Sequence, residues 1–278
     1  MYKKTILALS LMVFLNVYEM RSAMGQEKSF SYENYAYVLK TYVDNTGMVN
    51  YKALKNNRDQ LDSFVKNIDE LSSSVFKAWE EKEQIAFWIN AYNALTLKVI
   101  IDNYPIKSSF VTSLIYPKNS IRQISGVWDK ITFQVMSAPM TLDEIEHEQL
   151  RKNYNEPGIH MALVCAAMSC PPLRNEPYSG EKLDNQLNSQ TQRFLSDSDN
   201  FYLDKERKIF YLSSIFDWFG KDFIPSYNPS GKSGKFKAEE LAVLNFISKN
   251  VDKDTEEYIS KQDFKIEYIK YDWSLNEQ

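Results

Sequence analysis

The stretch KEQIAFWINAYNALTLKVIIDN, residues 82–103, decides the fold of this chain. Its apolar residues fall on every side of a helix instead of on one face, a pattern typical of a helix that is buried all round. Pro105 follows closely, and the residue before a proline is restricted to extended conformations, so the helix should end there. We therefore expect one buried central helix on which the other elements pack.

Weaker helical periodicity predicts further helices on both sides of this stretch. A capping box at Thr141 and Glu144, in which each residue bonds the backbone of the other, predicts a helix that begins there and runs to about Asn153. The remaining ranges with helical spacing are 32–43, 57–79, 180–196, 215–223 and 237–250.

Alternating apolar and polar residues predict a few strands. Ile131, Phe133 and Val135 alternate with polar residues within 125–140, which indicates a strand or one half of a hairpin. Two strands should flank a turn at 204–207, and a last one should lie within 264–271. The fold class expected is α+β: a helix-rich single domain, residues 26–278, with a buried central helix and a small, mostly antiparallel sheet.

The first 25 residues have the pattern of an export signal. Lys3 and Lys4 precede an apolar stretch from Thr5 to Tyr18, which has the usual length of a signal-peptide core and is too short to span a bilayer. Small residues end the segment, so we expect cleavage before Gln26. This predicts an exported protein, periplasmic or extracellular, with no membrane span in the mature chain.

The charge and the motif content exclude several classes of function. The net charge of −4 becomes −6 without the first 25 residues, because these carry three basic residues and one acidic residue. An acidic chain does not favour nucleic-acid binding, which needs a basic face. There is no phosphate-binding loop, dinucleotide-binding glycine triad or Gly-x-Ser-x-Gly elbow, so no cofactor is expected, and the substrate or protein partner stays unknown.

Several segments in order resemble one known family. These are AFWINAYNAL (86–95), LDEIEH (142–147), HMALVCAAMSCPPLR (160–174) and YDWSLN (271–276). They resemble the domain of unknown function 547 family over most of the mature chain. The resemblance implies no assigned activity, so the residues must be interpreted by their own chemistry.

The two cysteines, Cys165 and Cys170, leave two alternatives open. In an exported chain they could form a disulfide if the four residues between them make a turn. If residues 159–166 instead continue as a strand, the two Cα atoms would lie beyond the ~7 Å limit for a disulfide, and at least one thiol would be free.

A free Cys170 could be a nucleophile, because it lies between Ser169 and Pro171-Pro172 at an expected break between elements. There the prolines could open a helix whose backbone amides face a developing oxyanion. We expect Cys165, inside the apolar run 161–167, to be a small buried residue.

The candidate bases are His160 and His147, the two histidines of the chain. Asn93 or Asn90 of the central helix could orient the imidazole as in a Cys-His-Asn site, or could instead join the core to a loop. Residues 159–167 would then be a buried structural element that positions His160, and residues 168–174 would hold the chemistry.

Two other functions stay open. One is a non-catalytic binding or scaffold domain in which Cys165 and Cys170 form a disulfide. The other is a zinc site that uses Glu144, His147, His160 and Cys170, although no compact ligand motif is present. The charged residues Glu146, Glu148 and Arg151 are expected on the outer face of their helix, although Arg151 could instead bind a carboxylate of a ligand.

Overall fold

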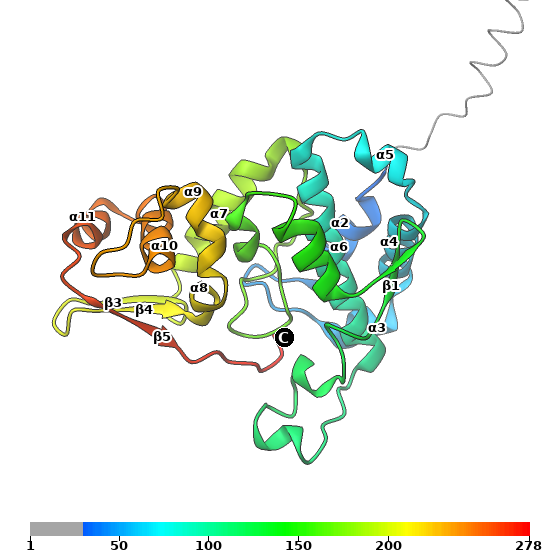
Figure 1. The fold of residues 1–278 in the computed structure, drawn as a ribbon. Coiled ribbons are helices and arrows are strands. Elements are labelled where there is room, and N and C mark those ends of the chain that lie inside the picture. The colour runs from blue at the N-terminus through cyan, green and yellow to red at the C-terminus, as the bar shows by residue number, and fades with distance from the viewer. Residues whose placement is uncertain (1–29) are drawn as a thin grey trace, which may run out of the picture. The chain divides into compact units, whose positions relative to one another are not determined.

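Helix α6 (Glu81–Asn103) lies at the centre of the computed structural model, which describes residues 30–278 (Figure 1). The predicted central helix is confirmed, because its side chains are buried on all sides from Ile85 to Ile101, with only Lys98 partly exposed. The export signal predicted for residues 1–25 lies outside the described residues. Within residues 30–278, no helix is both long and apolar enough to span a membrane.

The N-terminal helices pack beside α6 (Figure 1). Tyr35 and Phe64 stack with their ring centroids 4.7 Å apart and join the first of these helices to the third. Helices were predicted over 32–43 and 57–79, and both predictions are confirmed. The four helices are α2 (Glu33–Tyr42), α3 (Tyr51–Asn56), α4 (Asp59–Glu70) and α5 (Ser73–Lys77).

A short hairpin joins β1 (Phe133–Val135) to β2 (Ala138–Met140). Met136 and Ser137 both have positive φ angles, +50° and +60°, as the commonest two-residue hairpin turns require. The observed strand β1 is shorter than the alternating pattern that predicted it, because that pattern began at Ile131.

The capping box that was predicted after this hairpin is present. The Thr141 N–H donates to Glu144 Oε2 (2.8 Å), and the Glu144 N–H donates to Thr141 Oγ1 (3.1 Å). The helix that follows, η3 (Glu144–Arg151), is a π-helix and ends two residues earlier than expected. Short π-helical segments are rare in proteins, and those that occur often lie at functional sites.

The cysteine segment does not form the strand that was one of its two alternatives. Pro157–Met161 forms the 3₁₀ helix η4, and the chain then turns at Ala166, whose φ angle is +59°. No helix follows the prolines before residue 180, so the expectation that they open a helix is wrong.

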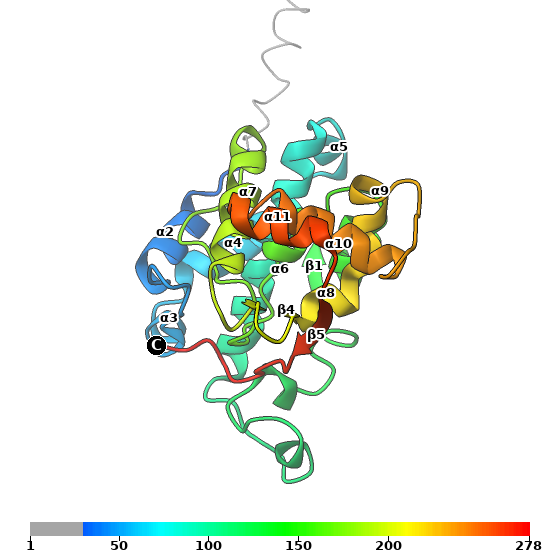
Figure 2. The same cartoon turned by 90° about the vertical axis from the view of Figure 1, so that its left-hand side faces the viewer.

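The C-terminal part contains a three-stranded sheet with helices beside it (Figures 1 and 2). Strand β4 pairs antiparallel with β3 and parallel with β5, so the three predicted strands form a mixed sheet. Helix α11 (Lys253–Lys261) was not predicted. The strands are β3 (Phe201–Asp204), β4 (Ile209–Ser213) and β5 (Lys265–Ile269).

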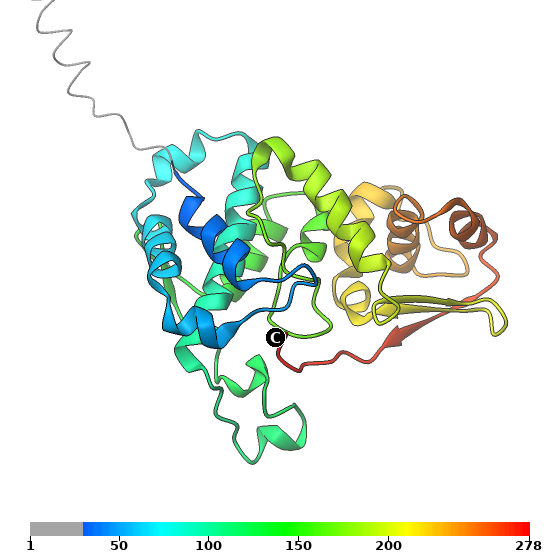
Figure 3. The same cartoon turned by 180° about the vertical axis from the view of Figure 1, so that it is seen from behind.

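The remaining helices confirm the ranges predicted at 180–196, 215–223 and 237–250. Helix α7 lies between the N-terminal helices and the three-stranded sheet (Figure 3). These helices are α7 (Leu183–Leu195), α8 (Ser214–Phe219), α9 (Ile224–Tyr227) and α10 (Ala238–Ser248), with the 3₁₀ turns η5 (Gly180–Lys182) and η6 (Gly220–Phe223).

The C-terminal segment returns from β5 to the N-terminal helices (Figure 1). Leu275 bridges Ala167, Glu277 bridges Val49, and the Tyr51 hydroxyl donates to Asn276 Oδ1 (2.7 Å). Residues 32–278 form one compact unit. The helix-rich α+β class predicted from the sequence is thereby confirmed, with two small sheets in place of one.

Candidate functional site

A cavity of about 480 Å³ lies where α6, η3, the cysteine segment, α8 and the C-terminal segment meet. The predicted residues Cys170, His160 and His147 all line it. So does Trp218, which is 47% exposed, together with Phe219. The other lining residues are Tyr92, Arg122, Trp128, Asp129, Asp143, Glu146, Leu163, Cys165, Pro171, Ile215, Tyr271 and Trp273.

Cys165 and Cys170 form a disulfide at the wall of this cavity, with their Cα atoms 6.2 Å apart. The turn at Ala166 brings them together, so the first of the two alternatives for the cysteines is the one observed. The Tyr271 hydroxyl lies 3.1 Å from the Cys170 sulfur and 3.3 Å from the Cys165 sulfur. The Cys165 N–H also points to the Cys170 sulfur, at 3.0 Å. Two hydrogen-bond donors are thus aimed at Cys170.

His160 is buried and anchored from one side. Its Nε2 lies 2.8 Å from Asp222 Oδ2, and its ring stacks on Phe219 with centroids 4.2 Å apart. Arg151 also binds Asp222, through Nε at 2.6 Å and Nη2 at 3.1 Å. Although burial opposes ionisation, the hydrogen bonds from His160 and Arg151 hold the pKa of Asp222 well below its usual range.

The charge of Asp222 decides the tautomer of His160. An ionised carboxylate only accepts hydrogen bonds, so His160 Nε2 must carry the proton that is donated to it. Burial lowers the pKa of His160 and outweighs the opposing effect of Asp222, so the ring is neutral. A neutral ring protonated at Nε2 leaves Nδ1 with its lone pair. His160 can therefore act as a base through Nδ1.

His147 has the same tautomer, but its Nδ1 already accepts a hydrogen bond. Arg151 Nη1 lies 2.7 Å from His147 Nδ1, and because arginine only donates, Nδ1 is the acceptor. Burial, and then the charge of Arg151, lowers the pKa of His147, so the neutral ring carries its proton on Nε2. The lone pair of His147 is thus already bonded. Of the two predicted bases, His160 is the one with a nitrogen available to accept a proton.

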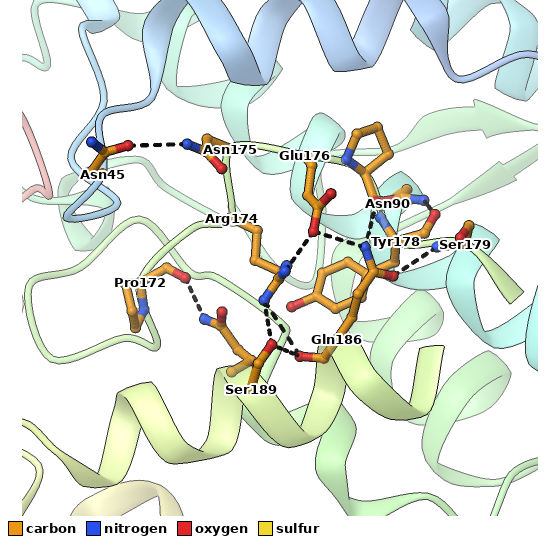
Figure 4. Close-up of polar contacts among 12 residues, drawn as sticks. Asn45, Asn90, Pro172, Arg174, Asn175, Glu176, Tyr178, Ser179, Gln186 and Ser189 are labelled. Carbon is orange, nitrogen blue, oxygen red and sulfur yellow. Dashed lines mark hydrogen bonds and ion pairs between the residues drawn. The ribbon is translucent and has the colours of Figure 1, made fainter. Parts of the chain in front are cut away.

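Asn90 and Asn93 bond backbone groups and not a histidine. Asn93 donates to the Ala162 carbonyl (2.9 Å) and accepts from the Val164 N–H (2.9 Å). Asn90 binds both backbone groups of Tyr178 in the same way, at 2.8 and 2.9 Å (Figure 4). The orienting contact that was expected from an asparagine is made by Asp222.

Asp222 was not among the site residues predicted from the sequence. It lies 62 residues from His160 in the sequence, between Lys221 and Phe223. Nothing in its local pattern distinguishes it from an aspartate on the surface.

Glu146 is the second residue that the sequence analysis placed wrongly. Its residue is only 9% exposed, and burial raises the pKa of its carboxyl to about 7. The prediction that Glu146 and Arg151 lie on an outer face is therefore wrong, whereas Glu148 is exposed as expected. A signal existed, because Glu146 lies four residues before the buried Leu150 and shares its helix face.

Aromatic side chains form part of the cavity wall. Trp218 and Trp273 lie nearly parallel, with centroids 6.0 Å apart, and Tyr271 packs against both. The Arg122 guanidinium lies 4.1 Å from the Trp273 ring centroid and 4.8 Å from that of Trp128. Such a wall suits a ligand with apolar or planar groups, and Asp129 and Asp143, which also line the cavity, add polar groups to it.

The end of the cysteine segment has a structural role. Arg174 binds the Glu176 carboxylate (2.5 Å) and the Ser189 hydroxyl (2.9 Å), and Gln186 holds the Pro177 carbonyl (2.9 Å) (Figure 4). These contacts fix the irregular chain after the prolines to α7. Of the segment 168–174, only Cys170 and Pro171 line the cavity.

The zinc ligands considered from the sequence do not form a cluster. Among the residues that the structure describes, no three His, Cys, Asp or Glu side chains lie in an arrangement that could hold a metal ion. Glu144 bonds the Thr141 N–H within the capping box.

Comparison with known proteins adds one match. Residues 76–195 match the family described as "Protein of unknown function, DUF547". The match includes α6, both histidines and both cysteines, and it ends before Asp222 and Tyr271. No curated protein and no solved structure matches the chain.

Proposed function

We propose that this chain, whose residues 76–195 form a DUF547 domain, is an exported cysteine-dependent hydrolase or transferase acting on an amide or related acyl bond. One observation carries the proposal. Cys170 lines the same cavity as His160, a neutral histidine whose Nε2 is bonded to Asp222. A thiol, a base and a group that orients the base are the parts that nucleophilic cysteine catalysis requires.

The chemistry begins from the reduced protein. A dithiol must first reduce the Cys165–Cys170 disulfide and itself be oxidised to a disulfide. His160 Nδ1 then takes the proton of the Cys170 thiol, and the thiolate attacks the acyl carbon of the substrate. The leaving amine or alcohol takes the proton from His160, and a thioester forms. Water or an acceptor amine releases the acyl group, and Cys170 recovers its proton.

The surroundings of Cys170 favour its thiolate. The Tyr271 hydroxyl and the Cys165 N–H both donate toward its sulfur, and donors stabilise a negative charge. Burial raises the pKa of Tyr271, so this hydroxyl keeps its proton and stays a donor at neutral pH. Asp222 holds His160 in the tautomer that accepts a proton.

Thiol alkylation tests the proposal. The Cys165→Ser variant has Cys170 as its one thiol, and its rate of reaction with iodoacetamide should titrate with a midpoint below the ~8.5 of a free cysteine. Adding His160→Gln should return the midpoint toward that value. Adding His147→Gln is the matched control and should shift it less, because the His147 lone pair is bonded to Arg151.

Two results would contradict the catalytic role. The first is a titration midpoint for Cys170 that is equal to or higher than the midpoint for Cys165, which is measured in the Cys170→Ser variant. The second is a midpoint that His160→Gln leaves unchanged.

A non-catalytic binding domain is the second candidate, and the disulfide favours it. A pair of cysteines 5 residues apart joins two parts of the cavity wall and would hold them for a ligand. This candidate predicts that the reduced thiols react slowly at every pH below about the pKa of a free cysteine. Thiol titration of the native and reduced protein separates the two functions.

Export is part of the proposal and has a separate test. Disulfides persist mainly in oxidising compartments, which fits the signal-like pattern of residues 1–25. Intact-mass analysis of the protein from the extracytoplasmic fraction should give a chain that begins at Gln26. A protein that keeps Met1 and stays in the cytoplasm would contradict this.

A further inference from the structure

The loop between α6 and η2 (Ile121–Gln123) extends away from the body of the fold, as all three ribbon views show (Figures 1, 2 and 3). Its regular structure is the single 3₁₀ turn η1 (Thr112–Leu114). The proposed chemistry uses none of the residues of this loop.

Four large apolar side chains at the end of this loop are exposed to solvent. Phe110 is 83% exposed, Val111 69%, Leu114 73% and Ile115 74%. We call these four residues the apolar tip. The other exposed large apolar side chains of the described residues are scattered and are at most 53% exposed. Single exposed apolar residues are normal, but a contiguous group of them marks an interaction surface.

The charge around the apolar tip is basic, although the chain as a whole is acidic. Lys107 and Lys118 lie on either side of the tip, and both are exposed. The sequence from 103 to 128 contains no Asp or Glu, whereas the whole chain has 37 acidic residues. This local positive charge complements an anionic surface.

Several polar groups beside the apolar tip bond Gln123 of η2, whereas the Ser113 hydroxyl has no hydrogen-bond partner. Gln123 Oε1 accepts from the Ser109 N–H (3.2 Å) and also bonds the Thr112 hydroxyl. Gln123 Nε2 donates to the Pro117 carbonyl (3.0 Å). These bonds lower the cost of moving the bonded groups out of water. The basic residues beside the tip, with no Asp or Glu from 103 to 128, are what favours an anionic lipid surface.

We propose that the apolar tip inserts into the surface of an anionic lipid bilayer, with Lys107 and Lys118 at the level of the headgroups. Apolar residues that enter the boundary between headgroups and acyl chains, flanked by basic residues, are the pattern of peripheral membrane attachment. The base of the loop also reaches the cavity, because Tyr116 and Arg122 both pack against Trp273. Insertion therefore brings the candidate site close to the membrane.

Vesicle sedimentation with the full chain tests the proposal. Intact-mass measurement confirms that every variant has the same N-terminus. We expect binding to phosphatidylcholine vesicles that contain phosphatidylglycerol and much weaker binding to phosphatidylcholine alone. The double substitution Phe110→Ser with Leu114→Ser should weaken binding at least about tenfold, because two large apolar groups no longer leave water. The matched control, Tyr37→Ser with Tyr202→Ser, removes exposed aromatic rings elsewhere and should bind like the parent.

The charge has its own pair of variants. Lys107→Gln with Lys118→Gln should weaken binding to the anionic vesicles about tenfold at low salt, and added salt should reduce this difference. The control Lys205→Gln with Lys232→Gln removes the same charge from exposed positions elsewhere and should have little effect.

Hydrogen exchange locates the contact and excludes binding through the N-terminal apolar stretch. With anionic vesicles, residues 104–120 should become protected, and the β3–β4 turn should not. Binding that the apolar-tip variant leaves unchanged, or protection that lies outside residues 104–120, would overturn the proposal. A tip that binds a protein instead would leave sedimentation at background with both lipid mixtures, which also overturns it.

Discussion

Replacing Glu146 by Gln should stabilise the protein at high pH and not at low pH. Burial raises the pKa of the Glu146 carboxyl to about 7, above its ordinary value near 4.5. The folded protein therefore holds the proton more tightly than the unfolded chain, so stability is full below about pH 4.5 and falls as the pH rises through about 7. Gln has no proton to lose, so the variant avoids this fall.

The size of the effect follows from the same values. A difference of about 2.5 pKa units corresponds to about 3 kcal/mol, since each unit is 1.36 kcal/mol. We therefore expect the stability of the Glu146→Gln variant, relative to the parent, to increase by about 3 kcal/mol between pH 4 and pH 8. Any cost of the amide itself is present at both pH values and cancels in this comparison.

Urea denaturation followed by tryptophan fluorescence measures the free energy of unfolding at each pH. The control is Glu148→Gln, two residues away on the same helix but fully exposed, for which the difference should vary little with pH. A Glu146→Gln difference that is flat from pH 4 to pH 8, or that falls as the pH rises, would refute the assignment of Glu146 as a buried carboxyl with a raised pKa.

Two further substitutions test the buried polar contacts and the disulfide. Asn93→Ala should cost about 2–3 kcal/mol in chemical denaturation, because it leaves the Ala162 carbonyl and the Val164 N–H buried without their partner; a loss below that of an ordinary surface substitution would argue against this role. Cys165→Ser should lower stability by about 2 kcal/mol, the chain-entropy value for so short a loop. The parent measured in reductant should match it, and an unchanged denaturation midpoint under reducing conditions would show that the two thiols are not paired.

The pKa values of Glu146 and Asp222 shift in opposite directions. Burial raises the pKa of Glu146, and this effect outweighs the opposing charge of Arg151 and the hydrogen bond of Tyr92. Asp222 is held ionised by His160 and Arg151, even though burial opposes this. One carboxyl of this region can therefore be protonated near neutral pH while another stays charged, and such a separation is common at catalytic sites.

Local sequence patterns were sufficient for most of the elements. The all-round apolar character of residues 82–103 required a buried helix, and the reciprocal pairing of Thr141 with Glu144 required a helix start. Both signals depend on residues within a few positions of one another, where backbone geometry determines which side chains can meet. The β3–β4 hairpin was also predicted from residues close together in the sequence.

The sequence could not decide between a turn and a strand at the cysteines. Leu163 and Val164 suit a strand, but Asn93 of α6 bonds the Ala162 carbonyl and the Val164 N–H, and the chain turns at Ala166. Tertiary contacts overrode local propensity there. The disulfide follows from that turn.

By itself, the sequence determined the helix-rich architecture, the central helix and the residues from which a thiol site could be built. Only the tertiary structure decided that Asp222, and not an asparagine, holds His160, and that Tyr271 meets Cys170 from 101 residues away. The reason is physical. Periodicity records which face of an element is apolar, whereas a contact between distant residues depends on the path of the whole chain, which no local pattern specifies.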